Sequence, residues 1–303
     1  MKTIVPSYYR EFTCIADRCR HSCCIGWEID IDPVTYASYL AMPGVLGERL
    51  RACTACTEDG QAHFVLCGED ERCPMLRTDG LCALIAELGE GVLCQICEDH
   101  PRYRNDFSDR VEIGLGLACE AAARLVLDCR EPVSLIEIDD DGEEISLSPI
   151  EQRCLAVRDA AIEVLQRREQ AWEVRVKALL ELCGAAPDEY TINEWVQVLS
   201  DLEILDAHWV EALARVHCDA SMETIHAEQL AVYLIYRHFP KMRSGIEVSA
   251  LAAFAVLGCR LVGAVSAVLG DEGVVEAVRL FSSEIEYSEP NLYALLELLA
   301  EKA

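Results

Sequence analysis

Cysteine is the residue that most constrains what this chain can fold into. Of 17 cysteines in 303 residues, 13 fall within the first 129 positions. The opening residues, MKTIVPSYYREF, carry no apolar segment of the kind found in export signals. Clustered thiols in the reducing cytoplasm usually bind metal or do redox chemistry, because disulfides are rare there. The sequence therefore predicts a cytoplasmic protein whose N-terminal part binds metal.

The spacing of the cysteines suits metal ligation. A C-x2-C pair such as Cys94 and Cys97 directs both sulfurs to one side, because a tight turn or a helix start separates them. One close group lies within residues 14 to 24, and a second lies between 73 and 97. The candidate metal ligands are Cys14, Cys19, Cys23, Cys24, Cys73, Cys82, Cys94, Cys97 and Cys119.

The spacing leaves the identity of the metal open. Zinc would take four ligands in a closed tetrahedral site, for example Cys94, Cys97, His100 and one more. Iron-sulfur clusters prefer ligation by cysteine alone, and the surplus of candidates exceeds the needs of one zinc site. We therefore expect an iron-sulfur cluster of the 4Fe-4S type, with zinc as the alternative.

The other cysteines are expected to have different roles. Cys53, Cys56 and Cys67 lie in a polar stretch, where they are either further ligands or ordinary loop thiols. A last set falls on helical patterns and is expected in the protein core: Cys129, Cys154, Cys183, Cys218 and Cys259.

The charge of the chain excludes one large class of function. There are 26 basic and 53 acidic residues, a formal net charge of −27. Such a chain repels phosphate, so it is not expected to bind nucleic acid through a broad basic surface. Familiar nucleotide motifs are missing as well: Gly114 and Gly116 have no third glycine in the right place, and there is no P-loop.

The sequence predicts a mainly α protein with a Cys-rich, loop-rich N-terminal part followed by an α-helical C-terminal part. We place the Cys-rich metal domain at 1 to 135, an acidic linker or hairpin at 136 to 148, and the helical domain at 149 to 303. The helix at 149 has a capping box, with Ser148 as N-cap and Glu151 three residues on. In the Cys-rich part, Asp32-Pro33 predicts a helix start, and residues 84 to 88 predict one or two helical turns. Apolar periodicity predicts helices at 149 to 183, 191 to 201, 203 to 217, 223 to 239, 247 to 269, 271 to 285 and 290 to 302.

Residues 248 to 269 are apolar enough to raise the question of a membrane span. Arg260 lies near the middle of this stretch, and a strong basic flank is missing. We therefore expect a buried core helix and no membrane partner.

Polar residues beside the cysteines are candidates for chemistry. Arg102 could clamp a carboxylate, or it could stabilise a turn by pairing with Glu98 or Asp106. Glu120, next to Cys119, could orient a ligand or receive a substrate amine, or it could be plain helix surface.

Three stretches closely resemble the flagellin lysine-N-methylase family, one of the CxxCxxCC-type groups of zinc- or iron-chelating proteins. The match covers about residues 6 to 129. The matching segments are PSYYREFTCIADRCRHSCCIGWEIDID, RCPMLRTDGLCALIAELGEGVLCQICEDHPRYRNDF and EIGLGLACEAAARLVL. The nine candidate cysteine ligands are matching positions, as are His100, Pro101 and Arg102. Cys53, Cys56 and Cys67 are outside the pattern.

The resemblance implies methylation of lysine ε-amines on flagellin with S-adenosylmethionine as methyl donor, near an iron-sulfur cluster. His100 or Glu120 would take the proton of the lysine, and the carboxylate of the cofactor would meet Arg102 or an open iron position. The substrate would be flagellin or another lysine-rich protein, which the negative field of the chain would attract. The alternative is a metal-chelating or electron-transfer module without catalysis, whose helical part docks a partner.

Overall fold

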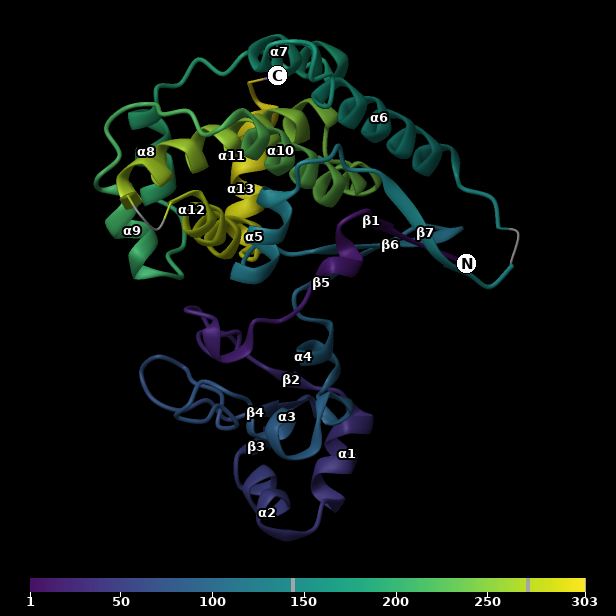
Figure 1. Ribbon diagram of the computed structural model, residues 1–303, viewed down its shortest axis with the longest axis vertical. Coiled ribbons are helices and arrows are strands. Elements are labelled where there is room, and N and C mark those ends of the chain that lie inside the picture. The colour runs from purple at the N-terminus through teal and green to yellow at the C-terminus, as the bar shows by residue number, and fades with distance from the viewer. Residues whose placement is uncertain (143–144, 271–272, 303) are drawn as a thin grey trace. The chain divides into compact units, whose positions relative to one another are not determined.

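The protein is described by a computed structural model, which covers residues 1–142, 145–270 and 273–302. It is mainly α-helical, as the sequence predicts. The chain divides into two compact units, one formed by 1–12 together with 104–303 and the other by 13–103. Unit 1 is the name used below for the first of these, and unit 2 for the second. Figure 1 shows the elements of both.

Unit 1 contains a four-stranded sheet with the order β5-β6-β1-β7. Strand β1 (Lys2–Pro6) pairs in parallel with β6 (Arg110–Leu115) and antiparallel with β7 (Leu135–Asp140), and β5 (Arg102–Asp106) lies beyond β6. These pairings join the first residues of the chain to segments more than 100 positions away. They explain why the structure divides the chain differently from the predicted boundary at 135.

Helices make up the rest of unit 1. Most of the predicted helices are present, and their ends differ from the predicted ones by a few residues. They are α5 (Glu120–Asp128), α6 (Pro149–Leu165), α7 (Trp172–Cys183), α8 (Ile192–Ser200), α9 (Ala207–Leu213), α10 (Thr224–His238), α11 (Val248–Leu269), α12 (Gly273–Phe281) and α13 (Glu289–Ala300). A 3-10 turn (Phe239–Ser244) follows α10, and a π-helical turn (Ser282–Glu286) follows α12. The first two residues of the helix predicted at 271 lie outside the described residues.

The predicted single helix over 149 to 183 is wrong, because the chain turns after Leu165. The predicted capping box at its start is present. At the break, Arg175 of α7 donates to the Leu165 carbonyl over 2.7 Å. The side-chain amide of Gln166 accepts a hydrogen bond from the Val133 N–H and donates one to the Val133 carbonyl. The Arg175 bond satisfies a carbonyl at the end of α6, and the Gln166 bonds tie this end to Val133. Helical periodicity cannot reveal such tertiary bonds.

The acidic stretch predicted as a linker or hairpin at 136 to 148 begins as part of the sheet. Residues 135 to 140 form β7, whose partner is β1 and not a second strand of the same stretch. The alternating pattern predicted extended backbone correctly. The partner strand, however, is β1 at the start of the sequence. Residues 143 and 144 lie outside the described residues.

Among the described residues, one helix is long and apolar enough to cross a membrane, namely α11. In its most apolar stretch, 78% of the residues are buried within the structure. Arg260 forms ion pairs with Asp188 at 2.8 Å and with Asp219 at 2.5 Å. The predicted core helix is therefore confirmed, and the fold is compatible with a soluble protein.

Unit 2 has short elements and much irregular chain, as expected for the Cys-rich part. Its three-stranded sheet has the order β2-β4-β3, and all pairings are antiparallel. The elements are β2 (Asp30–Ile31), α1 (Pro33–Ala41), α2 (Gly44–Ala52), β3 (Thr54–Cys56), β4 (Ala62–Phe64), α3 (Ala83–Leu88) and α4 (Gln95–Asp99). Predicted helix starts at Pro33 and near Leu84 are confirmed.

A buried ion pair connects the sheet of unit 1 to its helices. Arg158 of α6 pairs with Glu112 of β6, and the exposed fractions of these side chains are only 1% and 0%. The Arg158 guanidinium also lies 5.4 Å from the centre of the Tyr236 ring of α10. Burial raises the pKa of Glu112, and the arginine opposes this shift. The carboxylate therefore depends on Arg158 for its charge.

Replacing Arg158 with methionine should destabilise unit 1 strongly. Removing one partner leaves a buried charge without compensation, which costs about 3 to 5 kcal/mol. Urea unfolding followed by circular dichroism measures this loss. As a matched control, Arg167→Met removes an exposed pair with Glu163 and should change stability by less than about 0.5 kcal/mol. Equal effects of the two variants would contradict the assigned role of the buried pair.

Candidate metal centre

Backbone hydrogen bonds bring the two cysteine groups of unit 2 together. The Cys73 amide donates to the Cys24 carbonyl at 2.8 Å, which places the first group beside the second. Leu76 and Cys82 form an isolated β-bridge, so the chain folds back on itself within this second group. Segments that lie about 50 positions apart in sequence therefore meet at this point.

The C-x2-C pair stands at the start of α4. Cys94 is the N-cap residue of this helix, and its carbonyl accepts the amide of Cys97 at 3.0 Å. Asp32 holds the helix in place: one carboxylate oxygen accepts the Gln95 amide at 3.0 Å, and the other caps α1 through the Thr35 amide at 2.9 Å. The predicted turn geometry of the pair is confirmed.

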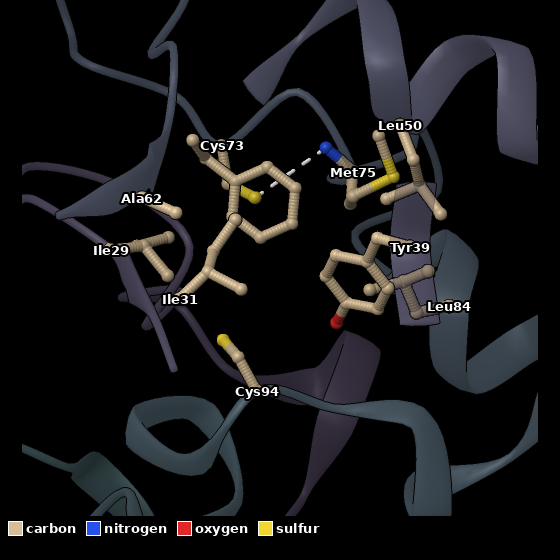
Figure 2. Packing of buried hydrophobic residues seen from close by; sticks show 10 residues of the cluster. Ile29, Ile31, Tyr39, Leu50, Ala62, Cys73, Met75, Leu84 and Cys94 are labelled. Atoms are coloured by element: carbon tan, nitrogen blue, oxygen red, sulfur yellow. Dashed lines mark hydrogen bonds between the residues drawn. The ribbon is translucent and has the colours of Figure 1, made fainter. Parts of the chain in front are cut away.

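The cysteines are part of the hydrophobic core of unit 2. Figure 2 shows the side chains of Cys73 and Cys94 among Ile29, Ile31 and Tyr39. The exposed fractions of Cys73 and Cys94 are 5% and 1%. Half-buried thiols packed against the same core belong to Cys24, Cys53, Cys82 and Cys97. This core is therefore built in part from thiols where a larger domain would use aliphatic side chains.

Hydrogen bonds between thiols divide the sulfurs into donors and acceptors. The thiols of Cys23 and Cys73 donate to Cys24 and lower its pKa to about 3. In the same way, Cys97 donates to Cys94 and lowers the pKa of that thiol. The thiolate is the form that binds metal, so Cys24 and Cys94 are prepared for ligation.

The donor thiols keep their protons more strongly. The pKa of Cys73 is raised by its bond to Cys24, and that of Cys97 is raised by its bond to Cys94. Burial raises the pKa of Cys82, and the charges on Cys24 and Cys94 raise it further. Hydrogen bonds and charge interactions therefore connect all five sulfurs into one continuous group. We call Cys24, Cys73, Cys82, Cys94 and Cys97 the thiol cluster.

His100 lies at the edge of the thiol cluster. Burial lowers the pKa of its imidazole, while the negative charge of Cys24 acts in the opposite direction. The imidazole packs against the indole of Trp27 with a distance of 6.1 Å between ring centres. At neutral pH the imidazole is therefore uncharged and can serve as a metal ligand or accept a proton.

The remaining predicted site residues are distributed over both units. Arg102 donates to the Glu98 carbonyl at 3.3 Å, so the expected partner residue is correct but the contact is with its backbone. Cys14 is exposed and accepts the Ala16 amide, and Cys19 donates to the carbonyl of His21.

Cys119 and Glu120 belong to unit 1, whereas His100 belongs to unit 2. Cys119 is the N-cap of α5. The Glu120 side chain is 5% exposed, so it is not plain helix surface, and it pairs with Arg124 at 3.5 Å. The two candidate proton acceptors, Glu120 and His100, thus stand in different units.

The thiols outside the pattern have ordinary local bonds. The Cys53 thiol donates to the Arg49 carbonyl at 2.7 Å, and the Tyr36 hydroxyl is hydrogen-bonded to the Cys56 thiol. Three of the cysteines predicted for the core of unit 1 are buried: Cys154, Cys183 and Cys259.

The core prediction is wrong for Cys218, which is exposed, and Cys129 is only half-buried. Cys129 is the C-cap residue of α5, and Cys218 lies in the irregular chain between α9 and α10. Neither residue therefore lies on a helical face. Helical periodicity cannot separate these positions from helix interiors.

Two features of the site were missed by sequence reasoning. The second bond of Asp32, to Gln95, joins residues 63 positions apart and has no local signal. The same holds for the Tyr39 hydroxyl, which donates to the Val92 carbonyl at 2.7 Å just before the C-x2-C pair. An Asp-Pro helix start does predict a cap, but not the second acceptor role.

Among the described residues, no three His, Cys, Asp or Glu side chains already stand in an arrangement that holds a metal ion. The thiols are paired with each other instead. Their chemistry nevertheless fits a metal, because thiolates and a neutral imidazole are the ligands that zinc and iron-sulfur centres use.

Comparisons with known protein families, with curated proteins and with solved structures find no match to this chain.

Asp32→Ala should loosen the link between α1 and α4. It removes a helix cap, worth about 1 kcal/mol, together with the acceptor of the Gln95 amide. Hydrogen exchange measured by NMR should be faster at the Thr35 and Gln95 amides. Asp59→Ala is the control, since Asp59 accepts from Thr57 in an exposed turn. Unchanged exchange at Gln95 would refute the link.

Proposed function

We propose that this protein is a metal protein whose thiol cluster binds an iron-sulfur cluster or zinc, and that it is an S-adenosylmethionine-dependent protein-lysine N-methyltransferase. The observation that carries the proposal is the convergence of five thiols from three separate segments in one buried core. An iron-sulfur cluster is favoured over zinc because these clusters prefer ligation by cysteine alone, and the thiol cluster offers the four cysteines that one 4Fe-4S centre needs.

The residues around the thiol cluster fit the chemistry of methyl transfer to lysine. A lysine ammonium must lose a proton before its nitrogen can act as a nucleophile. His100 would accept that proton, because its buried imidazole has a lowered pKa and is neutral at pH 7. Arg102 would bind the carboxylate of the methyl donor. S-adenosylmethionine, when bound, supplies the methyl group as an activated sulfonium.

The charge of the protein fits a basic protein substrate. A net charge of −27 raises the local concentration of a lysine-rich segment and repels nucleic acid. Flagellin, or another lysine-rich protein, is therefore the proposed methyl acceptor. The proposed site of action is the cytoplasm, where the thiols stay reduced.

One observation favours the second candidate, a metal-chelating or electron-transfer module without catalysis. The structure describes a cavity of about 460 Å³, but residues of α7, α11 and α13 line it, and none of the predicted site residues does. In this second function the thiol cluster would hold its metal away from solvent, and the helices of unit 1 would dock a partner.

Metal analysis tests the first part of the proposal. Protein purified without oxygen should contain about four irons and four acid-labile sulfides per chain, with a visible absorption band. Cys94→Ser should lose most of this metal, whereas Cys218→Ser, which changes an exposed thiol of unit 1, should not. Zinc without sulfide would leave a structural metal and favour the second candidate. Metal-free wild-type protein would reject both.

A methylation assay tests the second part. Metal-loaded protein with S-adenosylmethionine and flagellin should transfer methyl groups to lysine, detected by mass spectrometry. His100→Gln should lower kcat about 100-fold, the usual scale of a lost proton acceptor. His63→Gln, which changes a histidine on β4 of the same unit, is the control. If the loaded wild-type protein methylates nothing while its metal content is full, the module is the correct function.

A further inference from the structure

A lysine that lines the cavity described above lies on a pair of aromatic rings, one of which, Tyr190, also lines the cavity. The Lys302 ammonium is 2.6 Å from the centre of the Tyr190 ring and 4.9 Å from that of Trp195. The two rings are 5.3 Å apart between centres and inclined by 52°. An ammonium over inclined aromatic faces is the geometry by which proteins recognise alkylated ammonium groups.

The aromatic pair is held in position by a network of polar bonds. The Trp195 indole N–H donates to Asp188 at 2.7 Å, and Arg260 donates to the same carboxylate oxygen at 2.8 Å. Arg260 also donates to the Tyr190 carbonyl at 2.6 Å, and it is fixed from the other side by Asp219. These bonds fix the Trp195 indole and the backbone of Tyr190, so the two positions that carry the rings are preorganised.

The space beside the rings suits the stem of an alkylammonium side chain. The cavity of about 460 Å³ has apolar walls that include Leu180, Val256, Leu257 and Leu299. Lys302, Asp188 and Tyr190 also line it. Ligand pockets commonly combine apolar walls with a few fixed polar groups in this range of volume. The nearby Glu194 adds a negative charge that acts on the same ammonium.

We propose that Tyr190, Trp195 and Asp188 form a binding site for the alkylammonium group of a protein lysine or methylated lysine, and that Lys302 is its internal occupant. A ligand binds once Lys302 has left the rings. This site goes beyond the proposed methyl transfer, because it requires neither the thiol cluster nor any reaction. An unmodified lysine and a methylated lysine both present the alkylammonium group that this site would bind.

The rest of unit 1 offers a comparison for this arrangement. The Lys241 ammonium lies 5.3 Å from the centre of the Tyr293 ring, so it also contacts an aromatic face. Neither Lys241 nor Tyr293 lines the cavity, and the cation-aromatic contact found for Lys241 has one ring instead of two. Removing Lys241 should therefore expose no comparable site.

Binding of small lysine derivatives to variants of the full chain tests the proposal. The probes are N-acetyl-trimethyllysine amide, N-acetyl-lysine amide and N-acetyl-norleucine amide, the last without an ammonium. The readout is the shift of the Trp195 indole N–H resonance in 15N-labelled protein. Lys302→Ala should bind a charged probe at least about fivefold more tightly than the wild type, because its site is already vacant. Lys241→Ala should bind like the wild type.

The second variant removes one wall of the site. Tyr190→Ala combined with Lys302→Ala should lose the binding that Lys302→Ala gains, while an unchanged far-ultraviolet spectrum shows that it is folded. If the trimethyllysine probe binds more tightly than the lysine probe, the ligand is a methylated lysine. If the lysine probe binds equally well or more tightly, the ligand is an unmodified lysine. The proposal is overturned if norleucine amide binds equally well, or if Lys302→Ala binds no probe more tightly than the wild type.

Discussion

The pairing of β1 with β6 and β7 is the interaction on which the rest of the structure depends. Because Lys2–Pro6 lies between strands that begin more than 100 residues later, the chain must leave unit 1 after Phe12 and return to it at Arg104. Everything between these points folds as unit 2. The Cys-rich segment is thus an insertion in a helical protein, with both of its ends tied to one sheet.

Unit 2 illustrates how a small domain compensates for a limited hydrophobic core. Its helices are short, and much of its chain is irregular. Cys73 and Cys94 occupy positions in the core where they pack against aliphatic and aromatic side chains. A free thiol stabilises a core only as a small hydrophobic group does. The hydrogen bonds between these thiols favour the thiolate form of some of them, and a thiolate is the form that binds a metal ion. A metal bound here would contribute directly to folding.

Unit 1 holds its helices together partly through buried charge. Arg158 with Glu112, and Arg175 with Glu228, connect elements that are far apart in sequence, and these side chains are almost completely buried. Such pairs add little net stability compared with apolar packing, but losing one partner is costly. They therefore enforce one arrangement of the helices. The cavity lined by Lys302 also belongs to unit 1, and Arg260, which is only partly buried, bonds the Asp188 carboxylate that holds the Trp195 indole.

The sequence by itself determined the local features of this protein. Periodicity predicted most helices of unit 1, capping signals placed the starts at Pro33 and Pro149, and the C-x2-C spacing predicted how Cys94 and Cys97 begin a helix. Only the tertiary structure decided which segments meet: the partners of β1, the turn after Leu165, and the joining of Cys24 to Cys73. The physical reason is that helices and caps arise from neighbours in sequence, whereas strand pairing and buried contacts join residues whose separation leaves no periodic trace.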